Sequence, residues 1–190
     1  MDIQQNAPLV YVSFSAEISP ATTESLINVM SRLANLEVRE VYLLLSTPGG
    51  SVMNGMNLYN VLEGMPFELS IHNVGNVDSI GNAIFLAGQK RYATPNATFI
   101  FHGVGFNSPE NQRLEEKYFR EKLGGLLSDQ KRIGDIITGH TDITKQEIEE
   151  LFRETQTKDA TFALDKGLIH EIRSVEIVPG TPIVPLVFKR

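Results

Sequence analysis

The chain has 190 residues, 42% of them hydrophobic, which fits a single domain over residues 1–190 with a sizeable core. Its formal net charge of −6 argues against a nucleic-acid partner, because neutralising phosphates requires clustered Lys and Arg. The absence of cysteine excludes disulfides, a thiolate metal site and a cysteine nucleophile. No apolar run is long enough to span a membrane and no signal peptide is predicted, so we expect a cytoplasmic protein.

The first half of the sequence alternates strands with helices. Strands are predicted over residues 10–14, 41–45, 67–74 and 98–101, and helices from Ser19, after Gly50 and over residues 80–87. Pro20 supports the first helix start, because proline lacks the N–H that would stay unbonded in the first turn. Leu26, Met30 and Leu33 give that helix one apolar face. The alternation indicates an α/β fold with a largely parallel sheet and crossover helices.

The second half is predicted to be mainly helical. A long helical stretch covers about residues 109–139; its first half is heavily charged, its second half has an apolar face, and it contains Gly124-Gly125. Thr144 and Glu147 have the spacing of a capping box, which begins a helix running to about residue 152. Asp159 is expected to cap a last short helix ending near Gly167. Prolines at 179, 182 and 185 predict an extended tail over about residues 173–190.

Ser79 lies in the segment GNVDSIG (residues 75–81), between a predicted strand and a helix of small residues. A tight strand-to-helix turn is where many serine hydrolases present their nucleophile, and flanking glycines permit the close backbone approach that it needs. The strand over residues 98–101 ends at His102. Because a serine hydroxyl is a weak nucleophile until a base removes its proton, we assign Ser79 as nucleophile and His102 as general base.

A developing oxyanion needs preorganised donors, and the backbone N–H groups of Gly50 and Ile80 are the candidates. A phosphate-binding loop is excluded because no Gly-Lys-Ser/Thr follows the glycines. The alternative for Ser79 is a small residue that allows close helix packing, and the alternative for His102 is a strand-end histidine bonded to a backbone carbonyl. Structural roles are favoured for the remaining histidines, which are His72, His140 and His170.

These segments resemble the proteolytic subunit of the Clp protease family. The block STPGG (residues 46–50), the pattern G-x-x-x-S-x-G around Ser79, and Pro95-Asn96 leading to His102 follow the order of that family between about Leu9 and Ile172. The interval from Gly50 to Ser79 matches, whereas that from Ser79 to His102 is about two residues shorter, with the gap at a presumed turn over residues 88–91. The resemblance implies a ClpP/crotonase-type spiral of β-β-α units. It also implies a serine endopeptidase that hydrolyses peptide bonds through an acyl-enzyme.

The third member of a catalytic triad departs from the family pattern. In the family an acid holds the imidazole in its productive tautomer, and the matching position here is Thr155. A threonine hydroxyl accepts a hydrogen bond but carries no charge. Glu154 would need a one-residue shift, Asp159 is better explained as a helix cap, and Asp78 is expected to point away from its neighbour at a sharp turn. No acid is therefore assigned.

Lysine is an alternative base, since some peptidases with this fold pair serine with lysine. Lys117 and Lys122 follow the histidine in the long helix, but they lie among charges of both signs, which is typical of a solvated helix face. A lysine base would also need burial to bring its pKa toward neutrality.

The resemblance also implies partners. We expect a homo-oligomeric ring whose stacking uses the long handle helix, peptide or unfolded-protein substrates, and no cofactor or metal. Only about eight residues precede the first strand, so an ATPase unfoldase partner is doubtful and activity on short peptides is expected. Two other functions stay open: a catalytically weak Clp-like assembly subunit, favoured by Thr155, and a crotonase-type acyl-CoA enzyme, in which Ser79 and His102 would have no role.

Overall fold

The structure, a computed structural model, describes residues 3–107, 113 and 115–188. The strands are β1 (Leu9–Ser15), β2 (Glu40–Thr47), β3 (Glu68–Asp78), β4 (Lys90–Ala93), β5 (Thr98–Phe101), β6 (Gln156–Asp159), β7 (Glu171–Ile172) and β8 (Ile183–Leu186). The helices are α1 (Pro20–Asn35), α2 (Val52–Glu63), α3 (Gly81–Phe85), α4 (Glu116–His140), α5 (Lys145–Glu154) and α6 (Ala160–Asp165). Within the described residues no helix is both long and apolar enough to cross a membrane.

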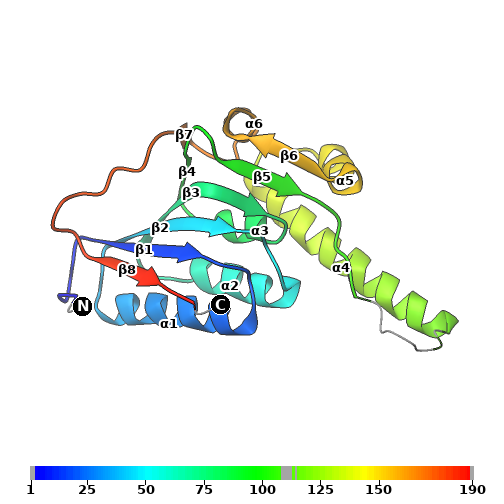
Figure 1. Ribbon diagram of the computed structural model, residues 1–190, viewed down its shortest axis with the longest axis horizontal. Coiled ribbons are helices and arrows are strands. Elements are labelled where there is room, and N and C mark those ends of the chain that lie inside the picture. The colour runs from blue at the N-terminus through cyan, green and yellow to red at the C-terminus, as the bar shows by residue number, and fades with distance from the viewer. Residues whose placement is uncertain (1–2, 108–112, 114, 189–190) are drawn as a thin grey trace.

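The strands form one mixed sheet in the order β6-β5-β3-β2-β1-β8, with β4 joined to β3 and β7 to β4 (Figure 1). Among the described strands every pairing is parallel except that of β5 with β6. Helices α1 and α2 lie side by side under the sheet, and α4 projects away from it (Figure 1). The predicted α/β class with a largely parallel sheet is confirmed.

Helix α1 begins where the sequence predicts. The Ser19 hydroxyl accepts a hydrogen bond from the Thr22 N–H at 3.3 Å, and Pro20 occupies the first helical position. The side chains of Leu26, Met30 and Leu33 are fully buried, so they form the face that packs against the sheet. At about 25 cal/mol per Å² of apolar surface, a fully buried side chain of this size contributes roughly 1.5–3 kcal/mol to stability.

Strand β3 changes partner half-way along its length. Its first part pairs with β4, with Ser70 opposite Lys90, and its last part pairs with β5, with Asp78 opposite Ile100. The register with β2 shifts between Leu45 and Thr47, which accommodates the bend. This change of partner brings the end of β3 beside β5, which ends one residue before His102.

Several segments differ from the sequence-based expectation, among them the unpredicted strands β6 and β7. Residues 88–91, taken as a turn, contain the start of β4, whose short run KRYA lacks the alternation that marks a strand. The tail includes β8, which pairs with β1 in parallel and encloses Pro185. Helix α4 begins at Glu116, and the earlier part of the predicted helical stretch, residues 108–112 and 114, lies outside the described residues.

Candidate active site

Ser79 occupies the turn between β3 and α3 in a left-handed backbone conformation, with φ of 57°. A residue with a Cβ seldom adopts this conformation, which costs about 1–3 kcal/mol and is concentrated at functional sites. Two interactions hold the turn against β5. The Ser79 N–H donates to the Ile100 carbonyl at 2.9 Å, and the buried Asn82 amide donates to both the Ser79 and the Ile100 carbonyls. The turn is thus fixed to the strand that ends beside His102.

The STPGG loop packs directly against this turn. A Cβ placed on Gly49 would lie 2.7 Å from the Ser79 Cβ and 2.8 Å from the Asp78 carbonyl oxygen, so only glycine fits there. Gly49 also has φ of 85°, which glycine adopts without strain. On the other side of the turn, a Cβ on Gly81 would lie 2.6 Å from the Thr47 Cγ2. The glycines of both motifs are explained by this close approach of two loops.

The candidate oxyanion donors are Gly50 and Ile80. The Ile18 N–H donates to the Gly49 carbonyl at 2.7 Å, and the Ser51 N–H donates to the Ile18 carbonyl at 2.8 Å, so the peptide groups flanking Gly50 are both tied to Ile18. Neither the Gly50 N–H nor the Ile80 N–H donates a hydrogen bond to an acceptor in the described part of the chain. Two backbone donors near the nucleophile are therefore available to a substrate oxygen.

His102 follows β5 directly and is half-buried. Its Nδ1 lies 2.8 Å from the Gly103 carbonyl oxygen. Because a carbonyl only accepts, Nδ1 carries the proton of the neutral ring and Nε2 is left as the acceptor. The Gly103 N–H donates to the Phe152 carbonyl at 2.9 Å, which ties the peptide group between His102 and Gly103 to the end of α5. This is the tautomer that a general base acting through Nε2 requires.

Thr155 is exposed at the end of α5, with a left-handed φ of 50°. In the antiparallel pair of β5 and β6, Phe101 lies opposite Gln156, so Thr155 and His102 are the next residues outward. No hydrogen bond joins these two side chains within the described residues. Asp159 accepts from the Phe162 N–H at 2.8 Å and caps α6, as predicted.

Asp78, to which the sequence pattern assigns no role, lies at the end of β3 with its side chain buried. Its partner in the register with β5 is Ile100, two residues before His102. Burial raises the pKa of the Asp78 carboxyl, while the Asn76 hydrogen bond, the Ile100 backbone amide and the His102 charge lower it by less. The sequence alone does not reveal this arrangement, because the face that Asp78 shares with β5 depends on the pairing of Asp78 with Ile100.

A groove of about 420 Å³ opens beside Gly50, one of the two candidate oxyanion donors. One wall is the segment from Gly50 to Met53, another is the chain just after His102 from Val104 to Phe106, and the third is α4. Lys122 lines this groove and is exposed, with Nζ 5.7 Å from the centre of the Phe106 ring. Lys117 is exposed as well and pairs with Glu121, so neither lysine has the burial that a lysine base needs.

The sequence matches the family model of the Clp protease over residues 8–176. The chain belongs to the Clp protease family. It is 29% identical over 147 residues to the ATP-dependent Clp protease proteolytic subunit 1 of Leifsonia xyli subsp. xyli (strain CTCB07), which covers 75% of this chain and 72% of that protein. Its fold is similar to that of a structure described as ClpP1 N165D mutant from Listeria monocytogenes. The TM-score is 0.77 at 18% identity, covering 87% of this chain and 91% of that one.

Membership of the Clp protease family implies a serine-type peptidase. It argues against the alternative of a crotonase-type acyl-CoA enzyme. The other histidines of this Clp protease family member have structural partners. The fully buried His72 accepts from the Tyr42 hydroxyl at Nδ1 and donates from Nε2 to the Arg173 carbonyl at 3.1 Å. His140 Nδ1 donates to the Ile136 carbonyl at 2.8 Å, and His170 Nδ1 accepts from the Arg91 N–H at 3.1 Å.

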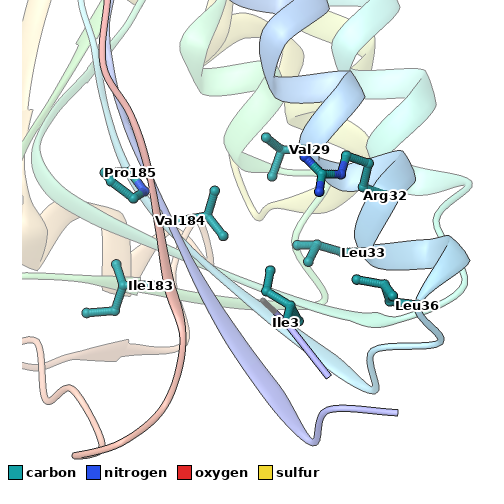
Figure 2. A pocket seen from close by; sticks show the side chains of 8 residues that line it. All are labelled: Ile3, Val29, Arg32, Leu33, Leu36, Ile183, Val184 and Pro185. Carbon is teal, nitrogen blue, oxygen red and sulfur yellow. The ribbon is translucent and has the colours of Figure 1, made fainter. Parts of the chain in front are cut away.

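A second pocket of this Clp protease family member, of about 540 Å³, lies between α1 and β8. Figure 2 shows Val184 pointing from β8 toward the side chains of α1, among them Leu33. Its lining is apolar except for Arg32 and includes none of the candidate catalytic residues. The groove of about 420 Å³, by contrast, includes Gly50 in its lining.

Proposed function

We propose that this chain is a serine endopeptidase that uses Ser79 as nucleophile and His102 as general base. The observation that carries this proposal is the contact of the STPGG loop with a strained Ser79 turn, beside two backbone N–H groups without an acceptor in the described chain. Such an arrangement is expected where an oxyanion forms next to a nucleophile. A merely structural serine at this turn would not need it.

The reaction runs in two halves. The Ser79 Oγ attacks the scissile carbonyl carbon while its proton passes to Nε2 of His102, and the negative oxygen is bound by the N–H groups of Gly50 and Ile80. Collapse of this intermediate breaks the C–N bond, and the amine leaves with the proton from Nε2. Water then attacks the acyl-enzyme with the same proton transfers, which releases the carboxylic acid and restores Ser79.

The Gly103 carbonyl takes the place of an orienting acid on Nδ1 of His102. It fixes the tautomer but supplies only a dipole, and Thr155 is uncharged too. Loss of the orienting carboxylate in well-studied triads lowers turnover by about four powers of ten. We therefore expect acylation of Ser79 with slow turnover, unless another carboxylate acts on the ring.

Labelling with a fluorophosphonate probe tests the proposal. Ser79→Ala should abolish labelling, and His102→Ala should slow it by about 10²- to 10⁴-fold, because the base contributes that much to serine activation. Ser128→Ala and His170→Ala, both at exposed positions, are the matched controls and should label at the wild-type rate. A folded wild-type protein that takes up no label, or labelling that survives in Ser79→Ala, would refute the assignment.

A second part of the proposal concerns the substrates and the need for an ATPase. We propose activity on short or unfolded peptides without an ATPase, since a groove of about 420 Å³ is the size of a site for a short peptide. Fluorogenic peptides of a few residues should be hydrolysed, whereas a stably folded protein should not be. Degradation of a folded, tagged protein only when an unfoldase and ATP are added would contradict the ATPase-independent part.

We further propose that the chain forms a homo-oligomer through α4, the handle helix. Phe119, Leu123 and Leu127 are spaced four residues apart and leave 52%, 56% and 57% of their surfaces exposed. A continuous apolar stripe on a projecting helix is typical of a self-association surface. The double variant Leu123→Glu, Leu127→Glu should lower the mass measured by light scattering, while Ser128→Glu should not. A wild-type monomer at micromolar concentration would count against this proposal.

The second candidate function is a Clp-like assembly subunit with little activity. The exposed Thr155 without a bond to His102 favours it. It predicts normal assembly with no labelling of Ser79, so the same probe experiment separates the two functions.

A further inference from the structure

We propose that Asp78 is a positioning residue for His102, a buried carboxylate that stabilises the imidazolium formed when His102 takes the proton of Ser79. This inference rests on the proposed roles of Ser79 and His102. It assigns the missing charge of the triad to Asp78, which precedes the nucleophile at the end of β3. Glu154 and Asp159, the acids near Thr155, lie on other elements.

The topology brings the two side chains to one face of the sheet. Asp78 lies opposite Ile100 in the parallel pair of β3 and β5, and His102 comes two residues after Ile100. Side chains two positions apart on a strand share a face, and His102 directly follows the last residue of β5, so we infer that Asp78 and His102 are diagonal neighbours. The pair is held in register because the Ser79 N–H donates to the Ile100 carbonyl at 2.9 Å.

Neighbouring residues hold the buried carboxylate of Asp78 in place. Only 8% of the residue is exposed. The Asn76 amide donates to Oδ2 of Asp78, and Asn76 is itself fixed by the Ser46 hydroxyl at 3.0 Å and the Thr47 carbonyl at 3.2 Å. The second oxygen, Oδ1, is buried without a partner that meets the geometry of a hydrogen bond in the described residues; the Ile100 backbone N–H acts on the carboxyl group but does not satisfy this oxygen. A buried polar oxygen without a partner is costly and rare, so it calls for an explanation.

A cation that exists only during the reaction explains this cost. The side chains near Asp78 on β2 and β3, those of Ser46, Thr47 and Asn76, are uncharged, and its partner on β5 is Ile100. Among the described residues His102 is the one charged group that acts on the Asp78 carboxyl, and its charge lowers the pKa of that carboxyl against the larger effect of burial. When the His102 ring takes up its second proton, the two charges attract each other in a partly desolvated site, where Coulomb interactions are strong.

The arrangement divides the usual task of a triad acid between two groups. The Gly103 carbonyl holds Nδ1–H and sets the tautomer of His102. Asp78 supplies the negative charge through space from the neighbouring strand. Thr155 then needs no catalytic role, which agrees with its exposure at the end of α5.

The test compares wild type with Asp78→Asn, which keeps the shape and the acceptor for Asn76. Two quantities are measured from pH 5 to 9: the second-order rate of fluorophosphonate labelling, and the pH midpoint at which the His102 ring signals titrate by NMR, assigned with His102→Ala. We expect at least about a tenfold lower labelling rate at the plateau, since one opposite charge nearby changes the energy of a charged state by about 1.4 kcal/mol or more. The acidic limb of the rate profile and the ring midpoint should both move to lower pH, because the imidazolium has lost its counter-charge.

Asp165→Asn, at an exposed position on α6, is the matched control and should leave both quantities unchanged. Asp78→Glu keeps the charge and serves if Asp78→Asn does not fold; its ring midpoint should stay near that of wild type while its labelling rate falls. A ring midpoint that is the same in wild type and Asp78→Asn overturns the inference, as does a faster labelling of Asp78→Asn. If the ring midpoint differs between wild type and Asp78→Asn while the wild-type protein takes up no label, the proposed peptidase activity is refuted. The coupling of Asp78 to His102 is still supported in that case.

Discussion

Gly49 touches Ser79 so closely that a Cβ atom on the glycine would lie 2.7 Å from the Cβ of the serine. Its φ of 85° adds to this restriction. Gly49→Ala should therefore push the STPGG loop off the Ser79 turn and cost about 1–3 kcal/mol of stability from backbone strain alone. The labelling rate of Ser79 should fall far more than the stability loss explains. Chemical denaturation and probe labelling of the same preparation measure the two effects.

Gly124→Ala is the control for that substitution. A Cβ on Gly124, in the exposed part of α4, meets nothing within 4 Å, so alanine should stabilise the helix by up to about 1 kcal/mol. An equal loss of labelling in both variants would mean that the Gly49 contact is not specific to the site.

Asn82 should couple the nucleophile turn to β5. Its buried amide donates to the Ser79 carbonyl at 3.1 Å and to the Ile100 carbonyl at 2.8 Å. Asn82→Ala should lower the free energy of unfolding by about 1–3 kcal/mol, the usual cost of losing buried hydrogen bonds, and reduce labelling as well. Asn57→Ala, at an exposed position on α2, should change neither. Wild-type labelling in a destabilised Asn82→Ala would show that the amide serves stability alone.

His72 should make the protein sensitive to acid. Burial lowers the pKa of His72 from 6.5 to about 4, with the Arg173 charge lowering it further and the bond to the Arg173 carbonyl opposing. Below pH 6.5 the unfolded chain therefore binds the proton more readily than the folded one, so stability falls as the pH drops toward 4. The loss amounts to roughly 3 kcal/mol for a shift of this size. Urea unfolding at several pH values should show a flatter profile for His72→Gln, and parallel profiles would contradict the prediction.

The contribution of Asp78 to stability should depend on pH in the opposite direction. Its pKa is raised in the folded state, mainly by burial, so the folded chain holds this proton more tightly and ionisation above the ordinary pKa is costly. Asp78→Asn should accordingly raise the melting temperature at pH 7, and the difference should shrink as the pH falls toward 4. A lower melting temperature for the variant at pH 7 would show that the carboxylate is stabilised there.

The sequence was sufficient for most of the central sheet because its strands are apolar runs and its helices have strong caps. Ser19, Thr144 and Asp159 all cap the helices expected of them, and residues 98–101 form β5 as predicted. The strands that escaped prediction are short or polar. β4, β6, β7 and β8 have 4, 4, 2 and 4 residues. β5 is equally short but is a nearly continuous apolar run, whereas β4 and β6 are polar, β7 has two residues and β8 contains a proline, so they form because neighbouring strands offer hydrogen bonds.

The sequence predicts those candidate site residues that stand within contiguous motifs. Gly50, Ser79, Ile80 and His102 stand in recognisable local patterns, and the assignment of their roles stays a prediction. The local pattern around Ser79 assigns no role to Asp78, because consecutive residues at a tight turn point apart. The pairing of β3 with β5, a contact between segments about 20 residues apart, places its side chain on the face of His102.

The change of partner along β3 has a mechanical consequence. The Ser79 N–H donates a hydrogen bond to the Ile100 carbonyl, and His102 follows Ile100 two residues later in the chain. Ser79, on the turn after β3, and His102, directly after β5, are thus coupled through a single residue of β5. A displacement of β5 would shift both groups in the same direction, so the distance between them should change less than the position of the strand.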